Sequence, residues 1–179
     1  MSAEPKFSTV WAMPSRWTFS IPPIASFVAR HVEGAAVIVD PFSGESTIGT
    51  HRNDLGRGGV DAEAFVRGLI ADGVRADVVL FDPPYSPRQI SECYKGIGRQ
   101  VTMKDTQSAL LYKGVRSALR DILKPDGIAL SFGWQSNGFG RGWVTREVLL
   151  VQHGGAHNDT ICVSQHRDLS QVALWEDAA

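Results

Sequence analysis

Three strongly apolar runs constrain the fold of this chain more than any other feature. They are AAVIVD at 35–40, ADVVLFD at 76–82 and IALSFGW at 128–134. A strand with one wet face alternates apolar and polar residues, whereas a strand buried on both faces is apolar throughout. The runs therefore predict central strands of a parallel sheet that is covered on both sides.

Segments with helical periodicity lie between these runs. IPPIASFVARHV at 21–32, DAEAFVRGLIADG at 61–73 and the segment 111–122 carry apolar residues three and four positions apart. Prolines suit the first turn of the first segment, and Asp61 and Gly73 are typical helix-start and helix-stop residues. Strands that alternate with helices predict right-handed crossovers and an α/β fold with a mostly parallel sheet.

Two further segments are predicted to be extended. STIGTHRNDL offers a short strand that ends near Asn53 and Asp54. REVLLVQHGGAHNDTICVSQHR at 146–167 has two extended runs around a Gly/His/Asn turn, which predicts an antiparallel hairpin at the C-terminal end of the sheet.

Length and composition favour one soluble domain. The chain has 179 residues, of which 43% are hydrophobic and 21% charged, and no apolar run is long enough to cross a bilayer. The N-terminus lacks the pattern of a signal peptide, so we expect a cytoplasmic protein without a membrane partner. Cys93 and Cys162 are far apart, which argues against a disulfide framework or a cysteine zinc site.

Positive charge is concentrated in one segment although the net charge is −1. Residues 86–124 hold 8 Lys and Arg against 3 Asp and Glu, whereas residues 1–85 hold 7 against 10 and residues 125–179 hold 3 against 6. The segment follows the strand that ends at Asp82. It is either a positive surface beside that strand end or a solvated helix face.

Acidic residues follow three of the predicted strands. Asp40, Asp54 and Asp82 end strands, and Asp61 opens the next helix. Ligands of open α/β sheets bind at the carboxyl ends of the strands, so these acids favour a ligand with hydroxyls, amines or positive charge. Neither GxxxxGK[ST] nor GxGxxG is present, so a nucleoside without phosphates fits better than a nucleotide.

The turn HGGAHNDT offers His153, His157 and Asp159 as potential metal ligands. Because no fourth ligand is evident, a hairpin loop without metal is the favoured interpretation.

Several motifs resemble one family. VIVDPFSG resembles the first cofactor motif of S-adenosylmethionine-dependent amino-methyltransferases, DPPY resembles their catalytic motif, and FSIPPI resembles the helix start that covers the methionine end of the cofactor. THRNDL, VDAEAFVRGL, FDPPYSPRQI, LKPDGIALSFGWQSNG and HGGAHNDTICV are similar to a small group of adenine-specific (N6) DNA methyltransferases of phages and bacteria. The resemblance covers residues 13–167 and implies a Rossmann-like methyltransferase fold in abbreviated form.

The resemblance also implies site residues and partners. S-adenosyl-L-methionine is the implied cofactor, and its implied contacts are Pro22, Pro23, Asp40, Pro41, Phe42, Gly44, Asn53, Asp54, Asp61 and Ala62. Of these, Asp61 is as well explained as a plain helix N-cap. The implied partner is double-stranded DNA with a flipped adenine, in a bacterial, archaeal or phage-infected cell. Whether the protein also pairs with a second copy of itself as a homodimer is left open.

The sequence departs from the wider family in two ways. Glu45 and Ser46 stand where a second glycine is usual, and too few residues separate Gly44 from the next strand for the usual helix. We therefore expect this helix to be absent or reduced to a turn.

The catalytic assignment is Asp82, Pro83, Pro84 and Tyr85. The carboxylate of Asp82 and the carbonyl after it would accept both hydrogens of the amine, the prolines would hold these acceptors rigid, and Tyr85 would stack on the base. Because an acid-Pro-Pro-aromatic motif suits any planar amine, N4 of cytosine or a base in RNA are alternative targets. A SAM-binding or DNA-binding protein without catalysis is the alternative from another class.

No separate target-recognition domain is evident, so we expect one domain over 1–179 with its core at 14–168. Recognition of a DNA sequence then falls to residues 86–107, to a second subunit, or is weak. The Gly-rich loop WQSNGFGRGW is expected either to lie beside the target base or to pack its Trp134 and Trp143 in the core. The predicted DNA-binding residues are Arg88, Lys95, Arg99, Lys104 and Asn137.

Overall fold

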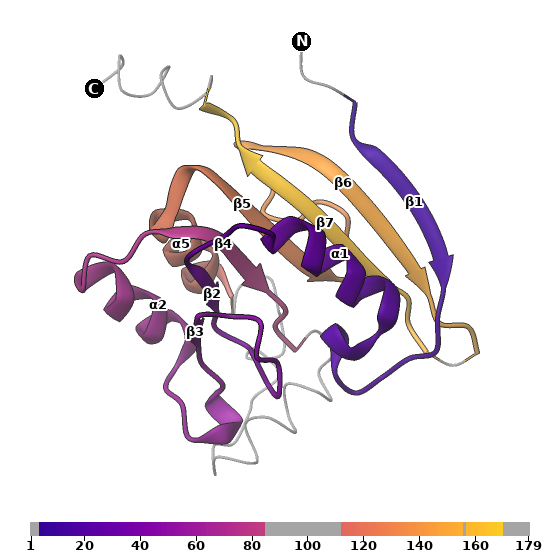
Figure 1. Ribbon diagram of the computed structural model, residues 1–179, viewed down its shortest axis with the longest axis horizontal. Coiled ribbons are helices and arrows are strands. Elements are labelled where there is room, and N and C mark those ends of the chain that lie inside the picture. Colours follow the sequence, from indigo (N-terminus) through magenta and orange to yellow (C-terminus); the bar gives the residue numbers. More distant parts are fainter. Residues whose placement is uncertain (1–3, 85–111, 156, 170–179) are drawn as a thin grey trace.

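A seven-stranded sheet forms the centre of the computed structural model, which describes residues 4–84, 112–155 and 157–169 (Figure 1). The strands are β1 (Lys6–Trp11), β2 (Ile38–Asp40), β3 (His51–Arg52), β4 (Ala76–Phe81), β5 (Leu123–Gly133), β6 (Trp143–Gln152) and β7 (Thr160–Arg167). Their order in the sheet is β1-β6-β7-β5-β4-β2-β3. Strand β7 is antiparallel to β5 and β6, and the other pairings are parallel.

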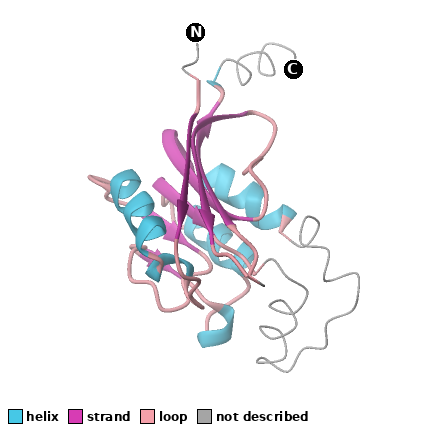
Figure 2. Ribbon diagram, turned by 90° about the vertical axis from the view of Figure 1, so that its right-hand side faces the viewer, coloured by secondary structure: helices cyan, strands magenta, loops and turns pink. Residues whose placement is uncertain are grey.

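Helices cover both faces of this sheet. They are α1 (Pro22–Val32), α2 (Ala62–Ala71) and α5 (Lys113–Ile122), with short 3-10 turns η1 (Thr18–Ser20) and η2 (Leu55–Arg57). Figure 2 shows the sheet edge-on between its helices, with α1 on one side and α2 and α5 on the other. Among the described helices, none combines the length and apolar character needed to cross a membrane.

The strand β4 shows why its sequence is apolar throughout. Val78 and Leu80 belong to the hydrophobic core on the α1 side, whereas Val79 and Phe81 belong to the core on the α2 and α5 side. Successive side chains of a strand point to opposite faces, so only a continuous apolar run buries both. The predicted α/β fold with a mostly parallel sheet and a C-terminal antiparallel hairpin is confirmed.

Helix α2 begins and ends where the sequence predicts. The Asp61 side chain accepts hydrogen bonds from the N–H groups of Glu63 and Ala64, at 3.0 and 3.1 Å. Gly73 ends the helix with a φ of +78°, a conformation that costs glycine little. The N-cap interpretation of Asp61 is thus confirmed.

Other boundaries differ from the sequence-based expectation. Strand β5 begins at Leu123, earlier than the predicted 128, because Leu123 already pairs with Ala76 of β4. The sequence did not predict strand β1. Within the described residues β1 pairs only with β6, and its Phe7 and Trp11 are exposed, so the segment lacks the buried apolar run. The connection from β2 to β3 contains turns and no helix, as expected.

A cluster of charged residues around the buried Glu147 links β1 to the rest of the fold. Glu147 of β6 is only 8% exposed, accepts a hydrogen bond from Arg30 of α1 at 2.7 Å and lies 3.7 Å from the Lys6 ammonium of β1. The charge pairs link the unpredicted strand to both the sheet and the helix.

The strand order reverses between β2 and β4. From β2 the chain passes to β3 on one side, and it then crosses to β4 on the other side of β2. The crevice at the carboxyl ends of two such strands is where open α/β sheets bind ligands.

Candidate active site

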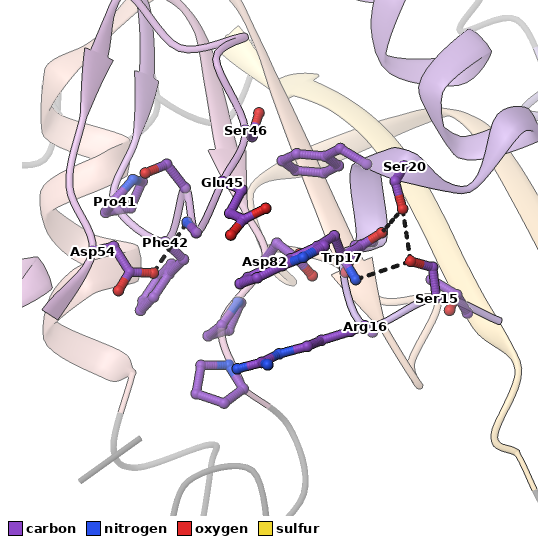
Figure 3. Close-up of a pocket in the computed structure, with 18 of the residues that line it drawn as sticks. Ser15, Arg16, Trp17, Ser20, Pro41, Phe42, Glu45, Ser46, Asp54 and Asp82 are labelled. Carbon is purple, nitrogen blue, oxygen red and sulfur yellow. Dashed lines mark hydrogen bonds between the residues drawn. The ribbon is translucent and has the colours of Figure 1, made fainter. Parts of the chain in front are cut away.

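A pocket of about 1670 Å³ lies at the carboxyl ends of the strands. Its walls come from the segment 14–21, from the loops that follow β2, β3, β4 and β5, and from the β6–β7 turn. The close-up in Figure 3 shows side chains of these segments around the pocket, among them Trp17, Glu45, Asp54 and Asp82. The pocket is therefore centred on the predicted edge of the sheet.

Asp82 follows β4 directly and lines this pocket together with Pro83 and Pro84. Desolvation raises the pKa of Asp82 to about 7, and a hydrogen bond with the Thr18 hydroxyl opposes that rise. A carboxyl group with such a pKa changes its charge near neutral pH. It can therefore accept hydrogen bonds as an anion and can also take up a proton.

Asp40 ends β2 and is completely buried. Its Oδ1 accepts a hydrogen bond from the Phe42 N–H at 3.2 Å, while its Oδ2 has no hydrogen-bond partner within the described part of the chain. Desolvation raises the pKa of Asp40 to about 7; the Phe42 N–H lowers it, and the nearby Asp82 and Asp54 raise it further. Asp40 supports the pocket from behind the loop 41–48 and is not part of its lining.

The loop after β2 approaches its neighbours closely at Gly44. Gly44 has a φ of +53°, and its N–H donates to Asp54 Oδ2 at 3.0 Å. A Cβ atom at this position would lie 2.7 Å from the ring of Trp17. Both the backbone conformation and the close contact therefore require glycine at this position.

Trp17 belongs to a wall of the pocket that the sequence analysis missed. Hydrogen bonds fix its turn, from the Ser20 hydroxyl to the Trp17 carbonyl at 2.7 Å and between the Ser15 and Ser20 hydroxyls at 2.7 Å (Figure 3). The guanidinium carbons of Arg16 and Arg57 lie 5.0 and 5.9 Å from the centre of its ring. In the sequence, the motif FSIPPI at 19–24 is the signal that indicates this wall, but it overlaps only the end of the segment 14–21.

The predicted cofactor residues divide into two groups. Those that line the pocket are Pro41, Phe42, Gly44, Asp54, Asp61 and Ala62. Those outside the lining are Pro22, Pro23, Asp40 and Asn53. Pro22 and Pro23 form the first turn of α1, directly after the pocket residue Ile21.

Asn53 serves the loop itself. Its side-chain N–H group donates to the carbonyls of Pro41 and Val60, and its Oδ1 accepts from the Val60 N–H at 3.0 Å. These bonds join the loops that follow β2 and β3. Asn53 therefore holds two pocket walls together and has little hydrogen-bonding capacity left for a ligand.

Of the predicted DNA-contacting residues, the structure describes only Asn137. Arg88, Lys95, Arg99 and Lys104 lie outside the described residues, as does Tyr85 of the catalytic assignment. Asn137 is exposed in the β5–β6 loop and does not line the pocket.

The described end of the basic segment divides between different roles. Arg116 of α5 lies 5.0 Å from the ring of Phe81, and Arg120 donates to the carbonyl of Arg141. Lys124 pairs with Asp77 near the amino end of β4. Lys124 therefore belongs to the edge of the sheet opposite the pocket.

The two tryptophans of the Gly-rich loop occupy different environments. Trp134 follows β5, lines the pocket and is 46% exposed. Trp143 is partly buried and packs against the core on the α2 and α5 side, with its ring 4.9 Å from that of Phe139. Gln165 fixes the loop between them, because its Oε1 accepts from the Phe139 N–H at 2.7 Å.

His153 is a structural residue of the β6–β7 turn. Its Nδ1 donates to the Ala12 carbonyl at 2.9 Å, because a carbonyl can only accept, and its Nε2 lies 3.0 Å from the Thr160 hydroxyl. Asp159 accepts from the His153 N–H at 3.1 Å. Among the described residues, no three His, Cys, Asp or Glu side chains are grouped so that they could hold a metal ion.

Comparisons with known proteins return solved structures only. TrmN from Thermus thermophilus is 16% identical, with a TM-score of 0.48 over 82% of this chain and 49% of that chain. A SAM-dependent methyltransferase from Agrobacterium tumefaciens is 16% identical, with a TM-score of 0.42 over 93% of this chain and 57% of that chain. The chain thus spans about half the length of these two proteins. No protein-family profile and no curated protein matches the sequence.

Proposed function

We propose that this protein transfers a methyl group from S-adenosylmethionine to the exocyclic amine of adenine in DNA. The observation that carries the proposal is that the Gly44 loop and the turn Asp82–Pro84 line one pocket. They follow adjacent strands, β2 and β4, on the two sides of the point where the strand order reverses. Both segments are among those that carry the sequence resemblance to adenine-specific methyltransferases.

The size of the pocket suits two ligands. Single small-molecule sites have volumes of about 300–1,000 Å³, and this pocket has about 1670 Å³. One part would hold the cofactor against the Gly44 loop, and the other would hold the base against Asp82 and Trp134. A direct methyl transfer requires that the cofactor and the base occupy one pocket at the same time.

The residues around the Gly44 loop fit a nucleoside cofactor with a positive charge. Gly44 lets the loop pack directly against the ring of Trp17, and Asp54 and Asp61 offer carboxylates in the pocket lining for ribose hydroxyls and the adenine amine. When bound, S-adenosylmethionine supplies an electrophilic methyl group on a sulfonium. Asp40 would act indirectly, through its bond to the Phe42 N–H.

Asp82 would prepare the amine for transfer. Its carboxylate and the next carbonyl accept the two hydrogens of the amine, so the nitrogen lone pair points at the methyl carbon. A bond forms between nitrogen and carbon as the carbon–sulfur bond breaks, and the positive charge that develops on nitrogen is stabilised by Asp82. With a pKa near 7, Asp82 can then take the proton that the nitrogen must lose.

Trp134 provides a stacking surface for the base. Its indole is half exposed within the pocket lining, and an extruded base is commonly held on such an aromatic face. Tyr85, the other proposed stacking residue, follows Pro84 in the chain.

Product identity tests this proposal. The purified protein is incubated with methyl-labelled S-adenosylmethionine and oligonucleotides that contain adenine or cytosine as the sole amine-bearing base, each as DNA and as RNA. We expect label in adenine of DNA. Label in cytosine alone, or in RNA alone, would replace this proposal with one of the two amino-methyltransferase alternatives.

A matched binding measurement separates a non-catalytic protein from an enzyme. Calorimetry of the wild type and of Asp82→Ala with the cofactor should give similar affinities, because Asp82 faces the base. If both bind the cofactor and neither transfers methyl to any oligonucleotide, the protein is a binding module.

A further inference from the structure

Tyr112 connects the proposed acceptor turn to helix α5. It occupies the N-cap position of α5, is only 5% exposed and lines the pocket. Its hydroxyl donates a hydrogen bond to the carbonyl of Pro84 at 3.1 Å, across 28 positions of sequence. Tyr112 therefore links the start of α5 to the Asp82–Pro84 turn.

The ring of Tyr112 completes a cluster of three aromatic side chains. It meets Phe42 edge-on at 5.5 Å and Phe81 edge-on at 6.1 Å, and Phe42 and Phe81 are 5.9 Å apart. Phe42 belongs to the loop after β2, and Phe81 precedes Asp82. The cluster thus joins the cofactor loop, the catalytic strand and the start of α5, through contacts of the edge-to-face kind that aromatic rings prefer.

The chemistry of proline explains why the turn needs such a partner. Pro83 and Pro84 have fixed φ angles but no N–H groups, so neither can donate a backbone hydrogen bond to fix the turn. The direction of a carbonyl depends on ψ, which the proline ring leaves free. The Tyr112 hydroxyl supplies a donor from elsewhere in the fold that holds the direction of the Pro84 carbonyl.

We propose that Tyr112 is a positioning residue, whose hydroxyl holds the Asp82–Pro84 turn and whose ring holds that turn in register with the Phe42 loop. This inference rests on the proposed function, in which the turn accepts the amine hydrogens. The hydroxyl acts on the acceptors of the base, and the ring acts on the cofactor side.

Two variants separate these contributions. Tyr112→Phe keeps the ring and removes the donor, so kcat should fall about tenfold, the effect of one lost hydrogen bond to a buried acceptor, while cofactor affinity stays unchanged. Tyr112→Leu also removes the aromatic contacts and should weaken cofactor binding as well. Val66→Ala is the control, because it opens the same core without touching the turn; it should lower Tm and leave kcat unchanged.

A spectroscopic readout tests the hydrogen bond independently of activity. With carbonyl-labelled proline, the 9 prolines of the chain give separate carbon resonances, and Pro84→Ala identifies the one from Pro84. Tyr112→Phe should shift that resonance and leave the others in place. An unshifted Pro84 resonance, or an unchanged kcat in Tyr112→Phe, would overturn the inference. If the wild type transfers no methyl group, the proposed function fails, and the Pro84 resonance still decides whether Tyr112 holds the turn.

Discussion

Two aspartates near opposite ends of strand β4 experience opposite environments. Near the amino end, Asp77 pairs with Lys124 and accepts hydrogen bonds from the N–H groups of Ala36 and Val37, at 3.0 and 2.8 Å. The Lys124 hydrogen bond and these N–H groups lower the pKa of Asp77. At the carboxyl end, desolvation raises the pKa of Asp82 to about 7, against one opposing hydrogen bond with Thr18.

The difference between Asp77 and Asp82 distinguishes the two edges of the sheet. At the edge of Asp77 the charged groups stabilise the fold, and at the edge of Asp82 the carboxyl groups are available for chemistry. Asp77 is surrounded by groups that stabilise its charge, so it ties β4 to the start of β2 and to β5. Asp82, and Asp40 behind it, are desolvated without equivalent partners among the described residues. Carboxyl groups of this second kind are characteristic of functional sites, where a ligand supplies the missing interactions.

The largest expected effect comes from exchanging the two acids for alanine. Asp82→Ala should lower the rate of methyl transfer about a thousandfold, because the amine loses its charged acceptor. Asp77→Ala should leave that rate unchanged and lower the free energy of unfolding by about 2 kcal/mol, because Lys124 and two N–H groups lose their acceptor. Single-turnover kinetics and denaturant unfolding of both variants check the pair. Equal losses of activity in Asp82→Ala and Asp77→Ala would contradict the different roles of the two edges of the sheet.

The tryptophans of the β5–β6 loop extend the comparison to aromatic residues. Trp134→Ala should raise the KM for DNA about thirtyfold, equivalent to about 2 kcal/mol of base stacking, with normal stability. Trp143→Ala should instead destabilise the fold by about 3 kcal/mol through a core cavity. Steady-state kinetics and thermal unfolding distinguish them, and a normal KM in Trp134→Ala would remove this residue from the site.

The pH dependence of transfer should follow the ionisation of Asp82. Because the carboxylate is the form that accepts the amine hydrogens, kcat/KM should rise about tenfold between pH 6 and pH 8 for an apparent pKa near 7. Asp40 lies close and titrates in the same range, so the apparent value belongs to the pair. Asp82→Asn should be slow and should lose most of the rise, whereas Asp77→Asn should keep it. A flat wild-type profile would contradict the role of the carboxylate.

Stability should respond to pH with opposite signs at the two acids. The raised pKa of Asp82 means that the folded state holds its proton between the ordinary value of 3.8 and about 7, so stability falls as pH rises through this window. The lowered pKa of Asp77 means that its contribution is present above the ordinary value and is lost as pH falls through the folded value. Unfolding of Asp82→Asn and Asp77→Asn as a function of pH measures the two windows separately.

The smallest effect concerns two glycines with left-handed backbones. Gly44 and Gly34 have φ angles of +53° and +76°, so alanine at either should destabilise by about 1 to 2 kcal/mol. Only at Gly44 would the new Cβ meet Trp17, since nothing lies within 4 Å at Gly34. Gly44→Ala alone should therefore weaken cofactor binding, about fivefold or about 1 kcal/mol. Equal cofactor affinity in both variants, measured by calorimetry, would place the cofactor away from this loop.

The sequence predicts the centre of this fold well and its margins poorly. The apolar runs identified β2, β4 and β5 because a strand buried on both faces has a pattern of its own. Strand β1 escaped prediction because its partner β6 is far along the chain and its own Phe7 and Trp11 are exposed. Likewise, the desolvation that raises the pKa of Asp82 is a property of the folded pocket.

For the site, local motifs predicted positions but could not predict hydrogen-bond partners. The acids at strand ends were placed at one edge by topology, as expected for parallel strands. Asn53 was assigned to the cofactor, whereas its amide joins two loops through Pro41 and Val60. The contact between Trp17 and Gly44 joins residues whose spacing has no periodic signature, so only the tertiary structure shows it.

The most direct test of this account is the fate of a deuterated methyl group. The wild-type protein is incubated with methyl-deuterated S-adenosylmethionine and double-stranded DNA, and the DNA is digested to nucleosides for mass spectrometry. The account predicts deuterated N6-methyladenine with the wild type and Asp77→Ala, and almost none with Asp82→Ala. Deuterium in another nucleoside, or the same yield of N6-methyladenine from Asp82→Ala, would contradict it.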